Sequence, residues 1–432
     1  MKQLMLVALV LTGTTATAQL YFPPNTPGVW DTLSPANLGW CQKKIDSLYT
    51  FLDSNNTKAF ILLKDGRIVL EKYFNGHAAS SNWYWASAGK TITAFMVGIA
   101  QQENYLKITD TTAAYLGAGW TSCTPAQEKK ITIRHQLTMT SGLDDGVADP
   151  YCTTPACLQY LTDVGTRWAY HNAPYTLLDP VIENATGQTL NVYTTQKLKN
   201  PTGMDGLFVS LGYNNVFLST ARSMARFGLL ILNKGNWNGS QILTDTSYFN
   251  QMVNTSQNLN QSYGYLWWLN GKSSYMVPQL QFVFNGSMAP NAPSDMIAAL
   301  GKNGQFVNVV PSQNLVWIRM GDAPDISLVS YTLNDSIWGY INDLSCNQLG
   351  VEPTQSQGTR YSIYPNPAKD FVYLQPRNKF SASEYKLYNL TGQLVGSGQC
   401  QGKLDISRLT TGVYYLRLWD GKMTETIKLV KE

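Results

Sequence analysis

One short stretch, residues 82–91, constrains the chain most strongly, because it places two reactive side chains at helical spacing. It reads Asn-Trp-Tyr-Trp-Ala-Ser-Ala-Gly-Lys-Thr, with Ser87 three residues before Lys90. Apolar side chains recur every three or four positions over residues 91–100, which predicts a helix. Residues three apart share one face of a helix, so the Lys90 amine can lie beside the Ser87 hydroxyl at the helix N-terminus. The stretch predicts a nucleophile next to a base.

The N-terminal segment predicts export. Residues 1–3 carry a positive charge, residues 4–11 are apolar, and residues 16–18 read Ala-Thr-Ala, a small-x-small cleavage site. We therefore expect a secretory signal peptide over residues 1–18. No later apolar run is long enough to span a bilayer, so we expect no transmembrane segment in the mature chain.

Charge and histidine content argue against two other classes of partner. The net charge of +4 over 432 residues is too small to indicate a nucleic-acid-binding surface. His77, His135 and His171 are too few and too scattered to predict a zinc site. We expect no metal and no cofactor.

The order of patterns predicts an antiparallel sheet with flanking helices and an inserted helical region. The first element is an amphipathic helix over residues 38–52, with Ser34-Pro35 as its N-terminal cap. A hairpin follows, and its turn is Lys-Asp-Gly at 64–66. Residues 87–268 are mostly helical in pattern with long loops. The remaining elements are hairpin strands at 59–63 and 67–73, late strands at 296–300, 306–310 and 315–320, and a final helix at 326–344. An early hairpin and late strands can form one sheet.

The pattern changes after a polar stretch that contains Pro353. We expect a globular domain over residues 19–346, a linker over 347–357 and a separate domain over 358–432. The last of these contains short strands without helices between them, which is typical of a small all-β sandwich. Its strands are predicted at 361–364, 371–374, 385–388, 413–418 and 426–430.

Two further segments complete a site with Ser87 and Lys90. Tyr170-x-Asn172 lies in a predicted loop, and residues 302–304 read Lys-Asn-Gly at a strand of the late sheet. With the run Leu-Thr-Met-Thr-Ser-Gly-Leu at 137–143, these segments resemble the serine β-lactamase and penicillin-binding-protein superfamily. They are most similar to its class C-like branch of esterases, D-stereospecific peptidases and 6-aminohexanoate-dimer hydrolases. The resemblance covers roughly residues 34–345. It implies an α/β (α+β) fold of the β-lactamase/transpeptidase type.

The resemblance also implies a role for each residue. Ser87 would form an acyl-enzyme, with Lys90 and Tyr170 as the general base pair. Lys90 must be uncharged to accept a proton, and both burial and a nearby cation such as Lys302 would lower its pKa. Asn172 would orient Lys90 and the substrate.

The Lys-Asn-Gly segment at 302–304 is expected to help form the oxyanion hole and to influence which substrates bind. Backbone N–H groups of Ser87 and Gln305 would form the oxyanion hole, beside Asn303 and Gly304. Many β-lactam-binding members carry a hydroxyl residue where this chain has Asn303. An amide there predicts weakened recognition of the β-lactam carboxylate.

The leading interpretation is a secreted serine hydrolase acting on small esters, amides or peptides. A D,D-peptidase or a class C-like β-lactamase is the alternative. A catalytically inactive penicillin-recognising binding module is a further alternative from another class. Covalent labelling of Ser87 separates the enzyme from the binding module.

The tail carries a resemblance of its own. Tyr-Pro-Asn-Pro at 364–367, Tyr-Asn-Leu-Thr-Gly-Gln at 388–393 and Thr-Gly-Val-Tyr-Tyr at 411–415 are similar to a type IX secretion C-terminal sorting domain. This resemblance implies a Bacteroidetes-type bacterium. It also implies the type IX machinery as a partner and a secreted or cell-surface location.

The six cysteines fit an exported protein. Cys152 and Cys157 flank a proline turn, and we expect them to pair near the mouth of the site. Cys41 and Cys346 lie on the first and last helices and are a weaker second pair. Neither of the other two cysteines has an evident partner.

Overall fold

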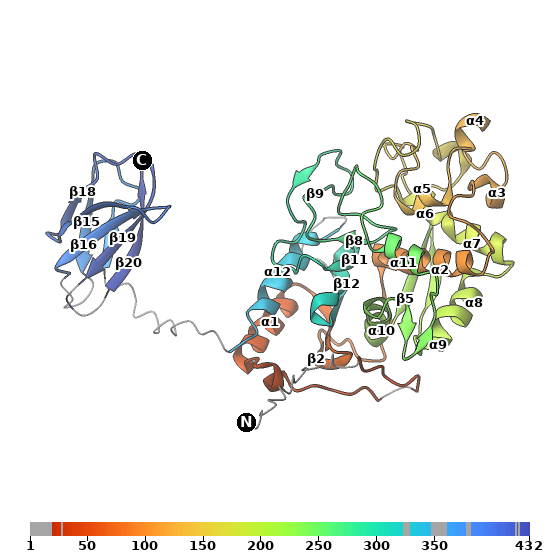
Figure 1. Cartoon of the computed structure of the whole chain (residues 1–432), viewed down its shortest axis with the longest axis horizontal. Coiled ribbons are helices and arrows are strands. Elements are labelled where there is room, and N and C mark those ends of the chain that lie inside the picture. Colours follow the sequence, from red (N-terminus) through yellow and green to blue (C-terminus); the bar gives the residue numbers. More distant parts are fainter. Residues whose placement is uncertain are drawn as a thin grey trace, which may run out of the picture. The chain divides into compact units, whose positions relative to one another are not determined.

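The structure is a computed structural model and describes residues 20–26, 29–322, 329–346, 361–376, 382–419, 421 and 424–432. The chain divides into two compact units, Met1–Asn347 and Gln348–Glu432 (Figure 1). The expected signal peptide and linker, residues 1–18 and 347–357, lie outside the described residues. Each unit is described here by itself.

The first unit is built on a six-stranded antiparallel sheet in the order β2-β1-β13-β12-β11-β8. Its strands are β1 (Thr57–Lys64), β2 (Arg67–Tyr73), β8 (Trp268–Leu269), β11 (Ile297–Gly301), β12 (Gln305–Val310) and β13 (Leu315–Gly321). The early hairpin joins the late strands through β1 and β13, where Phe60 pairs with Arg319. The predicted sheet, made from the two ends of this unit, is confirmed.

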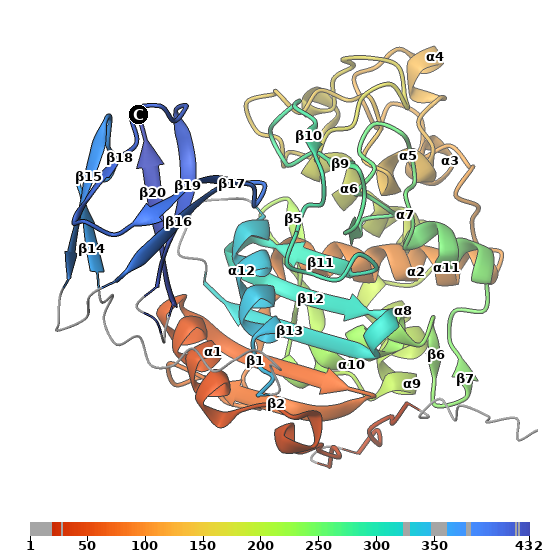
Figure 2. The ribbon, with the colours of Figure 1, turned by 60° about the vertical axis from the view of Figure 1, so that its left-hand side comes forward.

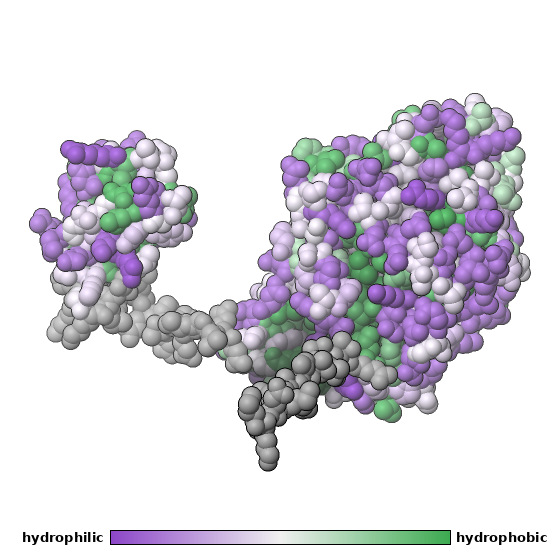
Figure 3. Space-filling model, in the orientation of Figure 1, coloured by the Kyte–Doolittle hydropathy of each residue, from purple (hydrophilic) through white to green (hydrophobic). Residues whose placement is uncertain are grey.

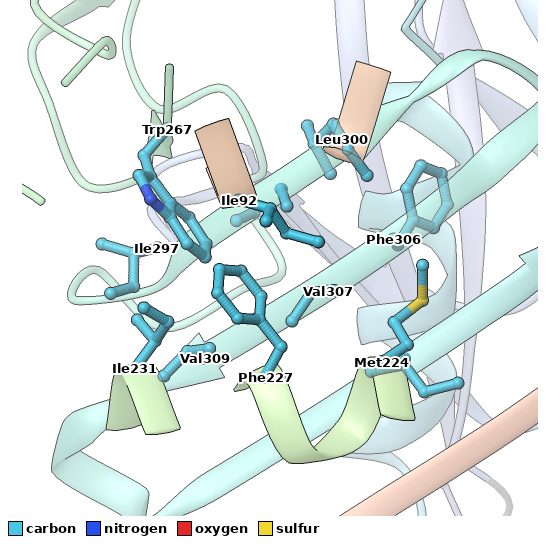
Figure 4. Packing of buried hydrophobic residues seen from close by; sticks show 14 of the residues in the cluster. Ile92, Met224, Phe227, Ile231, Trp267, Ile297, Leu300, Phe306, Val307 and Val309 are labelled. Atoms are coloured by element: carbon cyan, nitrogen blue, oxygen red, sulfur yellow. The ribbon is translucent and has the colours of Figure 1, made fainter. Parts of the chain in front are cut away.

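Helices cover both faces of this sheet (Figure 2). Helices α1 (Gln42–Ser54) and α12 (Tyr331–Asn342) pack together on one face, and α10 (Ala221–Leu232) lies against β12 and β13 on the other. Every residue of β12 is buried, so its sequence does not alternate between apolar and polar residues, and its two polar residues, Gln305 and Asn308, form hydrogen bonds inside the protein. Figure 4 shows Phe227 of α10 packed against Val307 of β12 and Trp267.

The first predicted helix is interrupted. Gly39 has φ of 70° and ends a short 3₁₀ helix, η1 (Pro35–Leu38), before α1 begins. Glycine adopts this left-handed conformation without steric cost, so the apolar spacing alone does not reveal the break.

Between β2 and β8 lies the inserted region, which is mostly helical. Besides α10, its helices are η2 (Ala86–Gly89), α2 (Lys90–Gln102), α3 (Ala113–Leu116), α4 (Pro125–Glu128), α5 (Ile133–Leu137), η3 (Pro155–Cys157), α6 (Asn172–Thr176), α7 (Leu178–Thr186), α8 (Leu190–Thr194), η4 (Thr195–Lys199), α9 (Asn200–Thr202) and α11 (Thr246–Met252). It also contains a small sheet that the sequence pattern did not indicate, β3 (Trp83–Tyr84), β5 (Asn214–Ser219) and β4 (Leu207–Leu211).

Helix α2 lies at the centre of this region, in contact with α7 and α11 (Figure 1). All residues from 90 to 100 are buried. A helix that is enclosed on every side is a core helix, which fits its apolar sequence. The face of the molecule in Figure 3 is mainly hydrophilic, as expected when the apolar residues are enclosed.

The second unit is all-β, as predicted. Two sheets, β14-β15-β18 and β17-β16-β19-β20, enclose a core that includes Val372, Leu416 and Leu429. Their strands are β14 (Tyr361–Tyr364), β15 (Phe371–Pro376), β16 (Glu384–Asn389), β17 (Leu394–Gln399), β18 (Lys403–Asp405), β19 (Gly412–Trp419) and β20 (Thr424–Lys431). Strands β17 and β18 were not predicted, because exposed glycine and polar residues obscure their alternation.

The structure contains two disulfides, Cys41–Cys346 and Cys152–Cys157. The other cysteines, Cys123 and Cys400, are free. Among the described residues, no helix has the length and apolar character needed to cross a bilayer.

Two helical glycines with different surroundings test how tightly α2 is packed. A Cβ at Gly98 would lie 2.4 Å from the ring of Tyr248, whose hydroxyl donates to the Ala94 carbonyl oxygen at 2.6 Å. A Cβ at Gly339 of α12 would lie no closer than 3.9 Å to its nearest neighbour, Asn291. We expect Gly98→Ala to destabilise the protein by about 1–3 kcal/mol through overpacking. Gly339→Ala should stabilise it by about 0.5–1 kcal/mol.

Thermal unfolding of both variants beside the wild type measures this difference. Equal and small shifts in Tm for the two substitutions would show that Tyr248 yields easily, contrary to the packing described here.

Candidate active site

The site begins at the junction of η2 and α2. Lys90, the first residue of α2, places its Nζ atom 3.0 Å from Ser87 Oγ and 2.8 Å from Asn172 Oδ1, with a hydrogen bond to each. Ala86, directly before Ser87, has φ of 47°, a conformation that is strained for a residue with a Cβ. Such strain concentrates at functional sites.

The Lys90 amine is enclosed by aromatic rings. The residue is 4% exposed, and its Nζ atom lies 4.1 Å from the Tyr175 ring centroid and 5.3 Å from that of Tyr170. Burial lowers the pKa of Lys90 to about 7, and the negative charge of Asp179 partly opposes this shift. We expected Lys302 to contribute as a second cation, but burial is the dominant cause. Near neutral pH a substantial fraction of the amine is therefore uncharged.

Tyr170 lies on the loop before α6. The Ser87 side chain acts on the pKa of its hydroxyl and lowers it slightly against the effect of burial, and its ring stacks on Trp268 at a centroid distance of 5.7 Å. Burial raises the pKa of Tyr170 well above its ordinary value, so the side chain is a neutral phenol at physiological pH. Asn172 was predicted in the same loop but begins α6, because His171 has extended backbone and serves as the N-cap residue.

The Lys-Asn-Gly segment forms the turn η5 (Lys302–Gly304) between the late strands β11 and β12. Asn303 has φ of 62°, and its Nδ2 atom donates to Tyr84 Oη at 2.6 Å. Buried Arg319 donates to the carbonyl oxygens of Asn303 and Gly304 at 3.1 and 2.7 Å. The turn is thus held from both sides.

Gly301 and Gln305 flank this turn, and they position the backbone of the two strands relative to η2. The Gln305 side chain is fully buried and hydrogen-bonds to the backbone of Gly321, so it serves to anchor the strand. A Cβ at Gly301 would lie 2.5 Å from the Trp85 carbonyl oxygen and 3.2 Å from the Ser87 nitrogen. Glycine at this position lets β11 approach the η2 backbone.

A cavity of about 200 Å³ opens onto these groups. Its lining residues are Ala86, Ser87, Lys90, Tyr151, Tyr170, Asn172, Tyr175, Asn214, Asn215, Val216 and Lys302. Asn303, Gly304 and Gln305 lie behind the lining. His171 is 2% exposed and also does not line the cavity, and burial lowers its pKa to about 4. Among the residues described, no three His, Cys, Asp or Glu side chains are grouped so as to hold a metal ion.

Several residues of the site were missed in the sequence. Tyr175 and Asn215 line the cavity, and Asp179 is a buried carboxyl group on α7. Only Asp179 carried a local signal in the sequence, because it interrupts the otherwise apolar residues 177–182. The loop residue Tyr151 lines the cavity next to the Cys152–Cys157 disulfide. This loop is attached to α6, because the Ala173 backbone N–H donates to the Pro150 carbonyl oxygen at 3.1 Å.

Solved structures with this fold include several hydrolases and related proteins. A proposed 6-aminohexanoate-dimer hydrolase from Bacillus anthracis matches with a TM-score of 0.55 and 20% identity, over 74% of this chain and 88% of that one. A proposed beta-lactamase from Bacteroides dorei matches with a TM-score of 0.55 and 16% identity, over 71% and 99% of the two chains. A family VIII carboxylesterase matches with a TM-score of 0.52 and 13% identity, over 71% and 99%. At these identities the likeness concerns the fold alone.

Comparison of the sequence with protein families gives two matches. A search of the curated proteins gives no significant match. The model of the secretion system C-terminal sorting domain matches residues 362–432, so the second unit is a sorting domain of this kind. The beta-lactamase model matches residues 56–322, more than half of the chain. The chain therefore belongs to the beta-lactamase family.

Proposed function

We propose that this protein is a secreted serine hydrolase that cleaves small esters or amides through an acyl-enzyme on Ser87. The observation that carries the proposal is the buried Lys90 amine, 3.0 Å from Ser87 Oγ at the wall of a cavity. An amine with a lowered pKa next to a hydroxyl is a general base in contact with its nucleophile.

In the proposed acylation, Ser87 Oγ attacks the substrate carbonyl carbon while its proton moves to Lys90 Nζ. The backbone N–H groups of Ser87 and Gln305 receive the developing oxyanion, which the close approach at Gly301 supports. As the bond from the acyl carbon to the leaving group breaks, Tyr170 gives its phenol proton to the leaving group and takes up the proton of the Lys90 ammonium. Water then attacks the acyl-enzyme by the reverse route.

The cavity favours a small acyl group. At about 200 Å³ it is smaller than the roughly 300–1,000 Å³ of sites that enclose drug-sized ligands. Its walls carry the amides of Asn172, Asn214 and Asn215, so a short acyl group with polar atoms fits better than a long alkyl chain. An inactive binding module would have no need of a buried base.

A D,D-peptidase or class C-like β-lactamase is the second candidate. The observation in its favour is Lys302, a cation at the cavity wall that could hold a substrate carboxylate. Against it, the Asn303 amide already donates to Tyr84 and does not line the cavity. Esters also need less protonation of the leaving group than amides do. We therefore rank esters first.

We also propose that the C-terminal unit directs export through the type IX secretion machinery to the cell surface or the medium. The match of residues 362–432 to the sorting-domain family supports this proposal.

The proposed nucleophile is tested by Ser87→Ala. The substitution should abolish covalent labelling by a fluorophosphonate and leave Tm nearly unchanged, because a methyl group fits where the hydroxyl was. Ser141→Ala is the control, since Ser141 is a buried serine that does not line the cavity. Labelling is read by intact-protein mass spectrometry, and a labelled Ser87→Ala protein would refute the mechanism.

The proposed base is tested by the pH dependence of kcat/KM. With the pKa of Lys90 lowered to about 7, activity should fall as the pH drops through this value and the amine becomes an ammonium. Lys90→Met should lower kcat/KM by about 10³-fold or more. Exposed Lys129→Met is the control and should change neither the rate nor the pH profile.

We expect Lys90→Met to lower activity but to raise the free energy of unfolding. In the unfolded chain Lys90 keeps its proton up to its ordinary pKa, so the free energy of unfolding rises with pH between about 7 and that value. Lys90→Met should remove this dependence and stabilise the protein at pH 7 by about 1–2 kcal/mol. A loss of stability at pH 7 would show that the amine is not held uncharged.

Substrate preference is tested with p-nitrophenyl acetate or butyrate against nitrocefin. We expect ester hydrolysis, with nitrocefin turned over more slowly or only acylating the enzyme, because the Asn303 amide donates to Tyr84 and does not line the cavity beside Lys302. Asn303 also has a left-handed backbone that disfavours a β-branched hydroxyl residue in its place. Efficient nitrocefin turnover without esterase activity would promote the second candidate.

A further inference from the structure

A buried carboxyl group lies close to the cavity and has no part in the mechanism above. Asp179 is 4% exposed and belongs to the first turn of α7. Burying a carboxylate without compensation is costly. The ion pairs formed by the described residues do not include it. The helix dipole favours a negative charge in a first turn, which offsets part of this cost.

Two hydrogen bonds fix the carboxyl group between Lys90 and the cavity wall. Thr93 Oγ1 donates to Asp179 Oδ1 at 3.2 Å, and Asn215 Nδ2 donates to Oδ2 at 3.2 Å. Thr93 follows Lys90 by three residues on α2, so both side chains lie on one face of that helix. Asn215 lines the cavity from β5.

Tyr175 completes the connection to Lys90. Its hydroxyl lies close enough to Thr93 and Asp179 for both side chains to act on its pKa, and its ring centroid lies 4.1 Å from Lys90 Nζ. The amine, the aromatic ring, the threonine hydroxyl and the Asp179 carboxyl group therefore form one continuous buried cluster. The cluster links α2, α6 and α7.

We propose that Asp179 is a positioning residue that acts through Lys90: it supplies the negative charge for the ammonium that forms when Ser87 is acylated. This inference rests on the proposed function. During acylation the Ser87 proton moves to Lys90 Nζ as the bond from Ser87 Oγ to the acyl carbon forms. No bond to Asp179 forms or breaks, and its effect is electrostatic.

The charges around the cluster support this role. Asp179 raises the pKa of Lys90 against the effect of burial, and burial raises the pKa of Asp179 itself to about 7. The positive charge of Lys90 lowers the pKa of Asp179, while Glu183, one turn later on α7, raises it. Each charge of the pair thus favours the other.

The remaining groups around Lys90 do not supply that negative charge. Tyr170 and Tyr175 face it as phenols whose pKa values are raised by burial. Tyr151 and Lys302 line the same cavity from a loop and from η5. Asp179 is therefore the carboxylate that acts on this amine.

The test reads the titration of Lys90 without requiring turnover. In a Ser87→Ala background, the reactivity of Lys90 with trace acetic anhydride is measured across pH by mass spectrometry. Asp179→Asn is nearly isosteric and should lower the pKa of Lys90 by about 1 unit, because it removes a nearby negative charge. Glu183→Gln is the control on the same helix and should cause a much smaller shift.

In the chain with Ser87 intact, Asp179→Asn should move the acid limb of fluorophosphonate labelling to lower pH by the same amount. The plateau rate should fall about tenfold, because the ammonium is less stabilised. A purely structural role would lower Tm and the rate at every pH equally, without moving the limb.

Thr93→Val is the second variant, in case Asp179→Asn does not fold. It removes one hydrogen bond to the carboxylate and should shift the Lys90 titration in the same direction by a smaller amount. An unchanged Lys90 titration in either folded variant would overturn the role of Asp179. A wild-type protein whose Ser87 is never labelled would instead overturn the proposed function.

Discussion

Burial of the Lys90 amine is the constraint on which the proposed active site depends. An ammonium in water holds its proton far above neutral pH, and only removal from solvent makes it a base near pH 7. That removal requires α2 to be enclosed all round, and its residues 90–100 are indeed buried. Elements from distant parts of the chain supply the enclosure, since α7 and α11 both contact α2. The fold of the whole inserted region is therefore a condition for the chemistry of one side chain.

The buried guanidinium group of Arg319 holds the η5 turn next to the site. Arg319 lies on β13 with no exposed surface, and its guanidinium group donates to the Asn303 and Gly304 carbonyl oxygens and to Thr57 Oγ1. It also donates to the carbonyl oxygens of Asn55 and Asp322. Arginine can satisfy several acceptors at once because its planar head carries five N–H donors. The η5 turn is thereby fixed to the sheet and not only to its own strands.

Local patterns explain what could be predicted from the sequence. The spacing of Ser87 and Lys90 is a property of one helix, and the sheet strands are apolar runs bounded by turns. Contacts across long separations leave no such pattern. The hydrogen bond from Asn303 to Tyr84 joins residues 219 positions apart, and the one from Asn215 to Asp179 joins residues 36 apart. The break at Gly39 and the helical start at Asn172 depend on backbone angles, which periodicity does not encode.

The loop closed by the Cys152–Cys157 disulfide connects these observations. Tyr151 lines the cavity next to this disulfide, and the Pro150 oxygen accepts from the first turn of α6, beside Asn172. The loop thus forms the part of the cavity wall that Tyr151 lines. Water would raise the local dielectric, weaken the attraction between Lys90 and Asp179 and return both groups toward their ordinary pKa values. The disulfide therefore restrains a loop that borders the cavity onto which Lys90 opens.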